Sequence, residues 1–471
     1  MAPAHLRFGG GAADSAINPL VALWLLIALV LIFALPRGKA IAPFLLAFFT
    51  IPIGQVVVLG GFHFTALRVL ILAGLVRRAT FPKSTLAGKY PGGFSALDWV
   101  VVFWSVSAVI ALFLEFPQMQ AFINCLGVLL DTLGGYLVVR SFIPDGETVR
   151  RTIKALAVIC TILGVCMINE QISHINIFGL LGGISREVTV REGTIRSAGS
   201  MGCLYAGAFA GVLVPLFLWL WTGGKSRMAA IFGLAGAIAM VITSNSSTSE
   251  LAIMGSFVGL GFWPLRKKMR LIRWGLVITL VGLHLAMKAP VWALIARIDL
   301  TGSSSGYQRF CLIDMTVKHF SNWWLIGSQD YPNWGWDSWD LCNQFVAVAL
   351  TGGLLTLIFY IAIFSRGFGA IGNARKRVSG DRQQEWLLWC FGSTLLATVV
   401  AHFGINDVAQ LYMGLFSLVA CISVVTFEAK QTTVSTTQKV AQEQMLSPVL
   451  VPELICNFGG AEQKVRYGLP R

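Results

Sequence analysis

Charged residues are scarce in this sequence. Asp, Glu, Lys and Arg make up only 12% of its 471 residues, whereas a soluble domain carries about 25%. Hydrophobic residues reach 56%, which excludes both an ordinary soluble domain and a disordered chain. The apolar residues form continuous runs instead of alternating with polar ones, and this pattern excludes a membrane β-barrel.

Several catalytic signatures are missing as well. There is no G-x-x-x-x-G-K-[ST], no G-x-S-x-G and no H-E-x-x-H, so the sequence does not support a pump with its own ATPase or an intramembrane zinc protease. The nine cysteines have no metal-like spacing, and most lie in apolar runs, where Cys acts as a small hydrophobe. We therefore expect no disulfide framework, no metal and no cofactor.

Apolar runs of about 20 residues recur along the chain, and that length crosses about 30 Å of hydrocarbon as a helix. They predict an all-α polytopic membrane protein with about 12–14 transmembrane helices and one large extracytoplasmic loop that contains short helices. We expect a helical domain over residues 1–430, including the loop 292–343, and a polar, disordered cytoplasmic tail over 431–471. The expected spans are 17–35, 41–60, 62–77, 98–114, 119–139, 152–169, 202–222, 228–245, 249–265, 271–291, 344–365, 385–403 and 408–427.

The connections between these spans differ in charge. Lys and Arg concentrate on alternate connections, for example at Arg77 and Arg78, at Arg266–Arg273 and at Arg375–Arg382. By the positive-inside bias this side is cytoplasmic. The net charge of +14 therefore belongs to cytoplasmic connections, and we expect no nucleic-acid partner. The N-terminus and the large loop lie outside in this topology, and the tail lies inside.

The longest polar interruption runs from Ser303 to Gly353. A connection of about 50 residues that is rich in Trp is usually functional. Its tryptophans have two interpretations, since indoles stack on sugar faces and also favour the membrane interface. We expect an amphipathic helix around Thr316–Phe320, close to lipid headgroups. The residues of this loop that can do chemistry are Arg309, Asp314, Lys318, His319, Asp330, Asp337, Asp340 and Asn343.

A second outer connection, between spans six and seven, carries three arginines although alternation places it outside. They are Arg186, Arg191 and Arg196. One interpretation is that Glu187 and Glu192 neutralise them on a solvated face. The other is that they bind an anionic ligand, because the planar guanidinium suits phosphate.

Two ionisable residues, Arg68 and Asp131, fall inside expected spans. Each costs about 2.5–3.5 kcal/mol at a helix centre, so such residues usually face a partner or a wet cavity. The two either pair with each other, or Arg68 lies near a re-entrant turn or snorkels to the interface. The hydroxyls of Thr243–Glu250 are interpreted as turn chemistry. His402, Asn406 and Asp407 of the 401–410 turn either line the same cavity as the large loop or have a structural role.

Five segments together resemble one family, the O-antigen ligases and O-antigen polymerases of bacterial inner membranes. FTALRVLILAGLVR resembles an arginine-bearing early helix of that family, and INEQISHINIFG resembles the outer end of a later one. GTIRSAGSM resembles its Arg-x-x-Gly segment, GYQRFCLIDMTVKHFSNWWLIGSQ the start of its long loop, and CNQFVAVALTGGLL the end of that loop. The resemblance covers roughly residues 60–425 and rests on the order of the segments and on the topology.

The resemblance implies a multi-pass glycosyltransferase of the bacterial inner membrane. It transfers glycan from an undecaprenyl-diphosphate donor to an acceptor hydroxyl at the outer face, without a nucleotide sugar. The outer loops contain no acidic metal cage of the D-x-D kind, so we expect arginines, and not a metal, to stabilise the diphosphate. Arg309, Arg196 and Arg191 are the expected diphosphate ligands, with Arg309, Asp340 and Asn343 as catalytic residues. Asp340 is the expected base, against Asp330 and Asp337. Expected partners are the lipid-linked glycan, membrane lipid, and a chain-length regulator or other assembly proteins.

The sequence departs from the family at one position. Many ligases have His before the Asn at the end of the loop, whereas this chain has Cys342 before Asn343. This difference favours a polymerase-like or divergent branch. A transporter or flippase of lipid-linked sugars stays open as an alternative, although no internal repeat of the kind typical of transporters is visible. A non-catalytic scaffold for polysaccharide assembly is a third.

Overall fold

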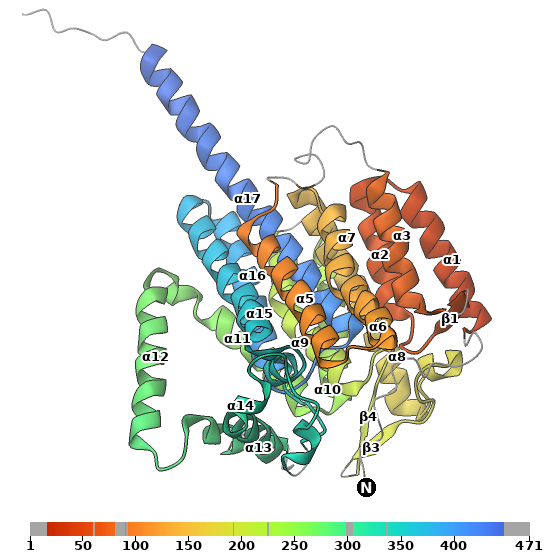
Figure 1. Cartoon of the computed structure of the whole chain (residues 1–471). Helices are drawn as coiled ribbons and strands as arrows, with labels where there is room; N and C mark the ends of the chain where they lie inside the picture. The colour runs from red at the N-terminus through yellow and green to blue at the C-terminus, as the bar shows by residue number, and fades with distance from the viewer. Residues whose placement is uncertain are drawn as a thin grey trace, which may run out of the picture. The chain divides into compact units, whose positions relative to one another are not determined.

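The computed structural model describes residues 17–59, 62–80, 90, 93–191, 193–223, 226–297, 305–335 and 338–446. The chain divides into two compact units, 1–430 and 431–471. The elements, in chain order (Figure 1), are α1 (Pro19–Ala34), α2 (Arg37–Thr50), β1 (Val56–Leu59), β2 (Phe62–Thr65), α3 (Ala66–Ala79), α5 (Ala96–Glu115), α6 (Met119–Leu129), η1 (Leu130–Gly134), α7 (Gly135–Phe142), α8 (Gly146–Ser173), η2 (Phe178–Leu181), β3 (Thr189–Arg191), β4 (Thr194–Arg196), α9 (Cys203–Thr222), α10 (Arg227–Ser244), α11 (Ser247–Gly261), η3 (Trp263–Lys268), α12 (Met269–Ala286), η4 (Val291–Arg297), α13 (Ser305–Lys318), α14 (Phe320–Trp323), η5 (Tyr331–Asn333), α15 (Gln344–Arg377), α16 (Arg382–His402) and α17 (Ala409–Leu446).

The protein is an all-α polytopic membrane protein, as predicted. Each of the thirteen expected spans coincides with a helix, and eight helices in the described part of the chain are long and apolar enough to cross a membrane. Helices α1, α2, α3 and α11 are shorter, with 14 to 16 residues each. Exposed Leu, Ile, Val and Phe side chains lie on α1, α3 and α11, a surface that suits contact with lipid tails, whereas the apolar side chains of α2 are covered.

Two boundaries correct the predictions. The expected span 41–60 ends at Thr50, and β1 pairs with β2 as an antiparallel hairpin in front of α3. The tail that we expected to be disordered from Gln431 begins as helix, because α17 continues to Leu446. Residues 447–471 lie outside the described part of the chain.

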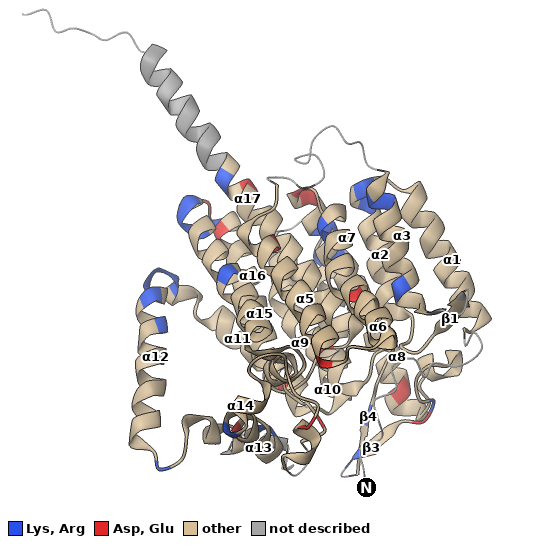
Figure 2. Ribbon diagram, viewed as in Figure 1, with Lys and Arg blue, Asp and Glu red and all other residues tan. Residues whose placement is uncertain are grey.

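The two ends of the helix bundle differ in charge. Figure 2 shows most Lys and Arg positions of the ribbon at one end, where α7 finishes and α12 and α16 begin. We call it the basic end. The opposite end, which carries the β3–β4 hairpin, α13 and α14 (Figure 1), is called the loop end. This separation has the pattern that the positive-inside bias produces.

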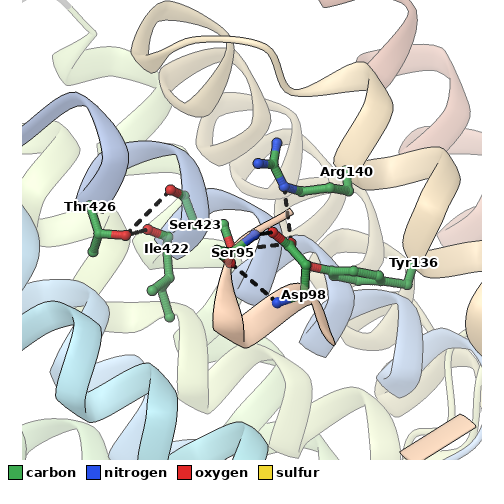
Figure 3. A network of polar contacts seen from close by, with 7 residues as sticks. All are labelled: Ser95, Asp98, Tyr136, Arg140, Ile422, Ser423 and Thr426. Carbon is green, nitrogen blue, oxygen red and sulfur yellow. Dashed lines mark hydrogen bonds and ion pairs between the residues drawn. The ribbon is translucent and has the colours of Figure 1, made fainter. Parts of the chain in front are cut away.

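A buried ion pair ties three helices together at the basic end. Asp98, the N3 residue of a capping box with Ser95 at the start of α5, lies 3.1 Å from Arg140 Nε of α7. The Tyr136 hydroxyl donates to the same carboxylate, and Ser423 Oγ of α17 donates to it at 3.4 Å (Figure 3). Both charged side chains are 1–2% exposed. A neutral pair of this kind holds its geometry because either charge alone is costly to bury.

We predict that Asp98→Ala lowers the free energy of unfolding by about 3–5 kcal/mol, because it leaves the buried Arg140 guanidinium without its carboxylate. The measurement is thermal unfolding of the purified protein in detergent. Glu147→Ala is the matched control: the Glu147–Arg151 pair is 39–60% exposed and is worth less than about 0.5 kcal/mol. Equal losses in the two variants would contradict the prediction.

Candidate functional site

A break in α15 anchors the large loop to the bundle. Within α15 the amide of Leu354 donates to Trp324 O (2.8 Å) instead of Leu350 O, four residues before it. The freed carbonyl of Leu350 accepts from Ser328 N at 2.9 Å. Gly353 has φ 74° at this break, which glycine alone adopts easily. The 324–328 turn thus replaces one helical hydrogen bond with two.

The anchored loop brings Arg309 of α13 against the turn between α10 and α11. Its Nη2 donates to Thr248 Oγ1 at 3.0 Å and to Ser247 Oγ at 3.3 Å. The side chain is 6% exposed, so Arg309 lies inside the protein. Burial lowers the pKa of Arg309 from its usual value, but an arginine stays protonated in proteins. The hydroxyls that we interpreted as turn chemistry are therefore ligands of a candidate site residue.

Arg196 reaches the same turn from the β3–β4 hairpin. On either side of it, Asn245 Nδ2 donates to Ile195 O (2.6 Å) and Ser197 N donates to Thr243 O (2.9 Å). Its side chain is 9% exposed. Thr189 pairs with Arg196 and Arg191 pairs with Thr194, so both arginines project from one face of the hairpin. Arg191, nearer the tip, is exposed.

Glu170 of α8 fixes the segment that follows Arg196. Its carboxylate accepts from the amides of Ala198 (2.8 Å) and Gly199 (3.1 Å), and Asn176 Nδ2 donates to Gly199 O. The two segments that contain these residues, INEQISHINIFG and GTIRSAGSM, therefore form one unit. Sequence reasoning singled out both segments but missed the role of Glu170 as their link.

The charges around this turn are unbalanced. Among the residues that the structure describes, neither Arg196 nor Arg309 forms an ion pair, and the Nε of each is buried without a hydrogen-bond partner. No side-chain cap closes the N-terminus of α11, and the buried Oγ of Ser246, its N-cap residue, has no partner either. Uncapped helix N-termini attract anions. The Arg309 guanidinium thus lies against the N-terminus of α11, the backbone on either side of Arg196 bonds to the turn before it, and both arginines keep an unused Nε donor.

The predicted catalytic residues of the loop separate in the structure. Asp340 is half-buried and accepts from Gln308 Nε2 at 3.3 Å. Gln308 precedes Arg309 in α13. Asn343 caps α15 by accepting from the amides of Phe345 and Val346. That capping role explains its position, and among the described residues Asn343 forms no hydrogen bond with Arg309. Asp330 lies on an exposed turn, bonded to Asn333, and Asp337 lies outside the described residues.

The aromatic side chains of the loop have mixed roles. Trp323 is buried and donates to Thr316 O, so it belongs to the core and to neither of the interpretations given above. The His319 ring stacks on Trp334, with centroids 4.5 Å apart. Trp339, next to Asp340, is exposed, which is the property that a sugar-stacking indole needs.

Arg68 and Asp131 pair with each other, one of the two arrangements expected for them. Arg68 Nη2 lies 2.7 Å from Asp131 Oδ2, and its Nε donates to both carboxylate oxygens at 3.0 Å. Asp131 sits in the π-helical segment η1, and Gly127 gives the guanidinium room, since a Cβ there would lie 2.8 Å from Nη2. The pair borders a cavity of about 110 Å³ with Gln55 and Tyr412.

A buried hydrogen-bond network lies where α15, α16 and the turn before α17 come together. His402 Nε2 is 3.1 Å from Asp407 Oδ1, and Tyr360 Oη lies 3.1 Å from His402 Nδ1 and 3.2 Å from Asp407 Oδ2. The amide of Asp407 donates to Gln344 Oε1, next to the end of the loop. No signal in the sequence joins Tyr360 to this turn, because the contact is between helices.

Comparisons with known proteins give no family for this chain: no family model and no curated protein matches it. The resemblance to O-antigen ligases and polymerases therefore stays a prediction. In the described part of the chain no three His, Cys, Asp or Glu side chains come together as a metal site.

We predict that Gly353→Ala destabilises the loop anchor, because the new Cβ would lie 2.5 Å from Leu325 O at a positive φ. Such strain costs about 1–3 kcal/mol, measured as a lower midpoint of thermal unfolding. The control is Gly369→Ala in the same helix, where a Cβ meets nothing within 4 Å and alanine favours the helix by about 1 kcal/mol. An unfolding midpoint for Gly353→Ala as high as that of the control would show that the positive φ at Gly353 does not contribute to stability.

Proposed function

We propose that this chain is a membrane glycan transferase that acts on undecaprenyl-diphosphate-linked oligosaccharide at the outer face of a bacterial inner membrane. One observation carries the proposal: Arg196 and Arg309 are buried beside the uncapped N-terminus of α11 without a carboxylate partner among the described residues. A buried charge without a counterion is costly. The diphosphate of a lipid-linked sugar is an anion of the right chemistry to occupy this position.

The reaction follows from this arrangement. An acceptor hydroxyl oxygen attacks the anomeric carbon of the donor, and the bond from that carbon to the diphosphate oxygen breaks. The electron pair and the growing negative charge go to the diphosphate, where Arg309, Arg196 and the amides of α11 stabilise them. The hydroxyl proton goes to a base, and Asp340, held by Gln308 beside Arg309, is our candidate.

A lipid-linked sugar transporter is the second candidate, and the Arg68–Asp131 pair favours it. An ion pair inside a helix bundle that borders a cavity is typical of transport pathways. The pair is neutral as a whole, however, and so offers less to a diphosphate than two unpaired arginines do.

We predict that Arg309→Ala and Arg196→Ala each lower the rate of glycan transfer by about 10²–10³-fold, the effect of removing a donor to transition-state charge. The assay uses protein in liposomes with lipid-linked oligosaccharide repeats and follows product size on a gel. Arg186→Ala, an exposed arginine of the same connection, is expected to keep the wild-type rate. EDTA is expected to have no effect.

The products discriminate between the candidates. A ladder of longer lipid-linked glycans indicates a polymerase. Consumption of donor only after addition of a lipid A core or a protein acceptor indicates a ligase. Movement of the lipid-linked glycan across the bilayer, with no consumption of donor, would show that the protein is a transporter and not a transferase.

A further inference from the structure

A large cavity at the basic end is lined by fifteen residues, of which seven are Lys or Arg and one is acidic. Its volume is about 820 Å³. The start of α12 and the segment before it contribute Arg266, Lys267, Arg270 and Arg273. The connection between α15 and α16 contributes Arg375, Lys376 and Arg382, about 100 residues further along the chain. Folding therefore brings two separate basic connections to one cavity.

The single carboxylate of this lining does not neutralise it. Glu385 Oε1 lies 3.2 Å from both Arg266 Nε and Arg375 Nη2. These two guanidiniums are further held over indole rings, Arg266 over Trp263 at 4.3 Å and Arg375 over Trp389 at 4.7 Å. Arg375 Nε is nevertheless buried without a hydrogen-bond partner.

The remaining cations form the rim of the cavity and have no carboxylate partner among the described residues. They are Lys267, Arg270, Arg273, Lys376 and Arg382. A positive-inside bias explains basic connections in general, but it does not require two of them to converge. Like charges around one cavity repel each other unless an anion lies between them.

The surroundings of the cavity identify the kind of anion. Helix α12 starts at this cavity and lies apart from the other helices (Figure 1), and none of its residues is buried. Its apolar side chains include Leu271, Trp274 and Ile278, all well exposed. On the opposite wall, Phe368 and two glycines of α15 leave open space. An occupant that satisfies both regions has an anionic head and an apolar tail.

We propose that this cavity, here called the basic cavity, binds the phosphate headgroup of an anionic phospholipid from the cytoplasmic leaflet, with its acyl chains along α12. Basic pockets between membrane helices on the cytoplasmic side are suited to such headgroups. Inorganic phosphate shares the head chemistry but leaves the apolar surface of α12 uncovered. The proposal concerns the end of the bundle opposite to Arg196 and Arg309 and does not depend on glycan transfer.

The test titrates the full-length protein in neutral detergent with phosphatidylglycerol and follows the midpoint of thermal unfolding. We expect phosphatidylglycerol to raise the midpoint and phosphatidylcholine to leave it unchanged. Arg270→Gln/Lys376→Gln removes two rim cations from opposite walls and is expected to raise the half-saturating lipid concentration about tenfold or more. The matched control is Arg366→Gln/Arg377→Gln, which removes two exposed cations of α15 outside the lining.

Three outcomes would overturn the proposal. The first is an equal half-saturating phosphatidylglycerol concentration for the two double variants. The second is a rise of the unfolding midpoint with phosphatidylcholine as large as with phosphatidylglycerol. The third is the same rise with millimolar inorganic phosphate, which would make this a site for the free anion. If the first variant does not fold, Lys267→Gln/Arg273→Gln tests the same cavity from one wall and is judged by the same outcomes.

Discussion

Hydrocarbon offers no hydrogen bonds, so each backbone group of a membrane-embedded chain must find its partner within the protein. The regular helices satisfy their own backbone groups. In the irregular segments, other parts of the chain supply the partners. The hairpin β1–β2 pairs its own strands before α3 begins. At Gly353 the chain opens one helical hydrogen bond and fills both of its ends with the 324–328 turn. The position of the large loop, and with it that of Arg309, follows from this exchange.

Buried charges are neutralised at the basic end but not at the loop end. At the basic end Asp98 and Arg140 neutralise each other inside the bundle, where an isolated charge would be costly. At the loop end Arg196 and Arg309 are buried beside hydroxyls and a helix N-terminus, which leave positive potential in place. A preorganised positive site of this kind stabilises negative charge without rearranging during a reaction. It is the property that a metal-independent transfer from a diphosphate would require.

The sequence predicted the helices well, because continuous apolar runs depend only on local composition. It also singled out Arg196 and Arg309 as candidate site residues, and their role in binding stays a prediction. It did not predict their shared turn, because Ser247 and Thr248 look like ordinary turn residues until Arg309 of α13 donates to them. The capping role of Asn343 could have been inferred from its place before an apolar helix. The network of Tyr360, His402 and Asp407 could not, since it joins residues on different helices.

The contacts of Asp98 with Arg140 and Ser423 form in a fixed order during synthesis. Arg140 follows Asp98 by 42 residues, so a charged pair can enter the membrane as one neutral helical unit early in synthesis. Ser423 follows by 325 residues and reaches the same carboxylate only when α17 has been made. The two helices inserted early therefore keep one acceptor position open for the last. In a chain that stops before Ser423, the carboxylate of Asp98 lacks the partner that α17 supplies.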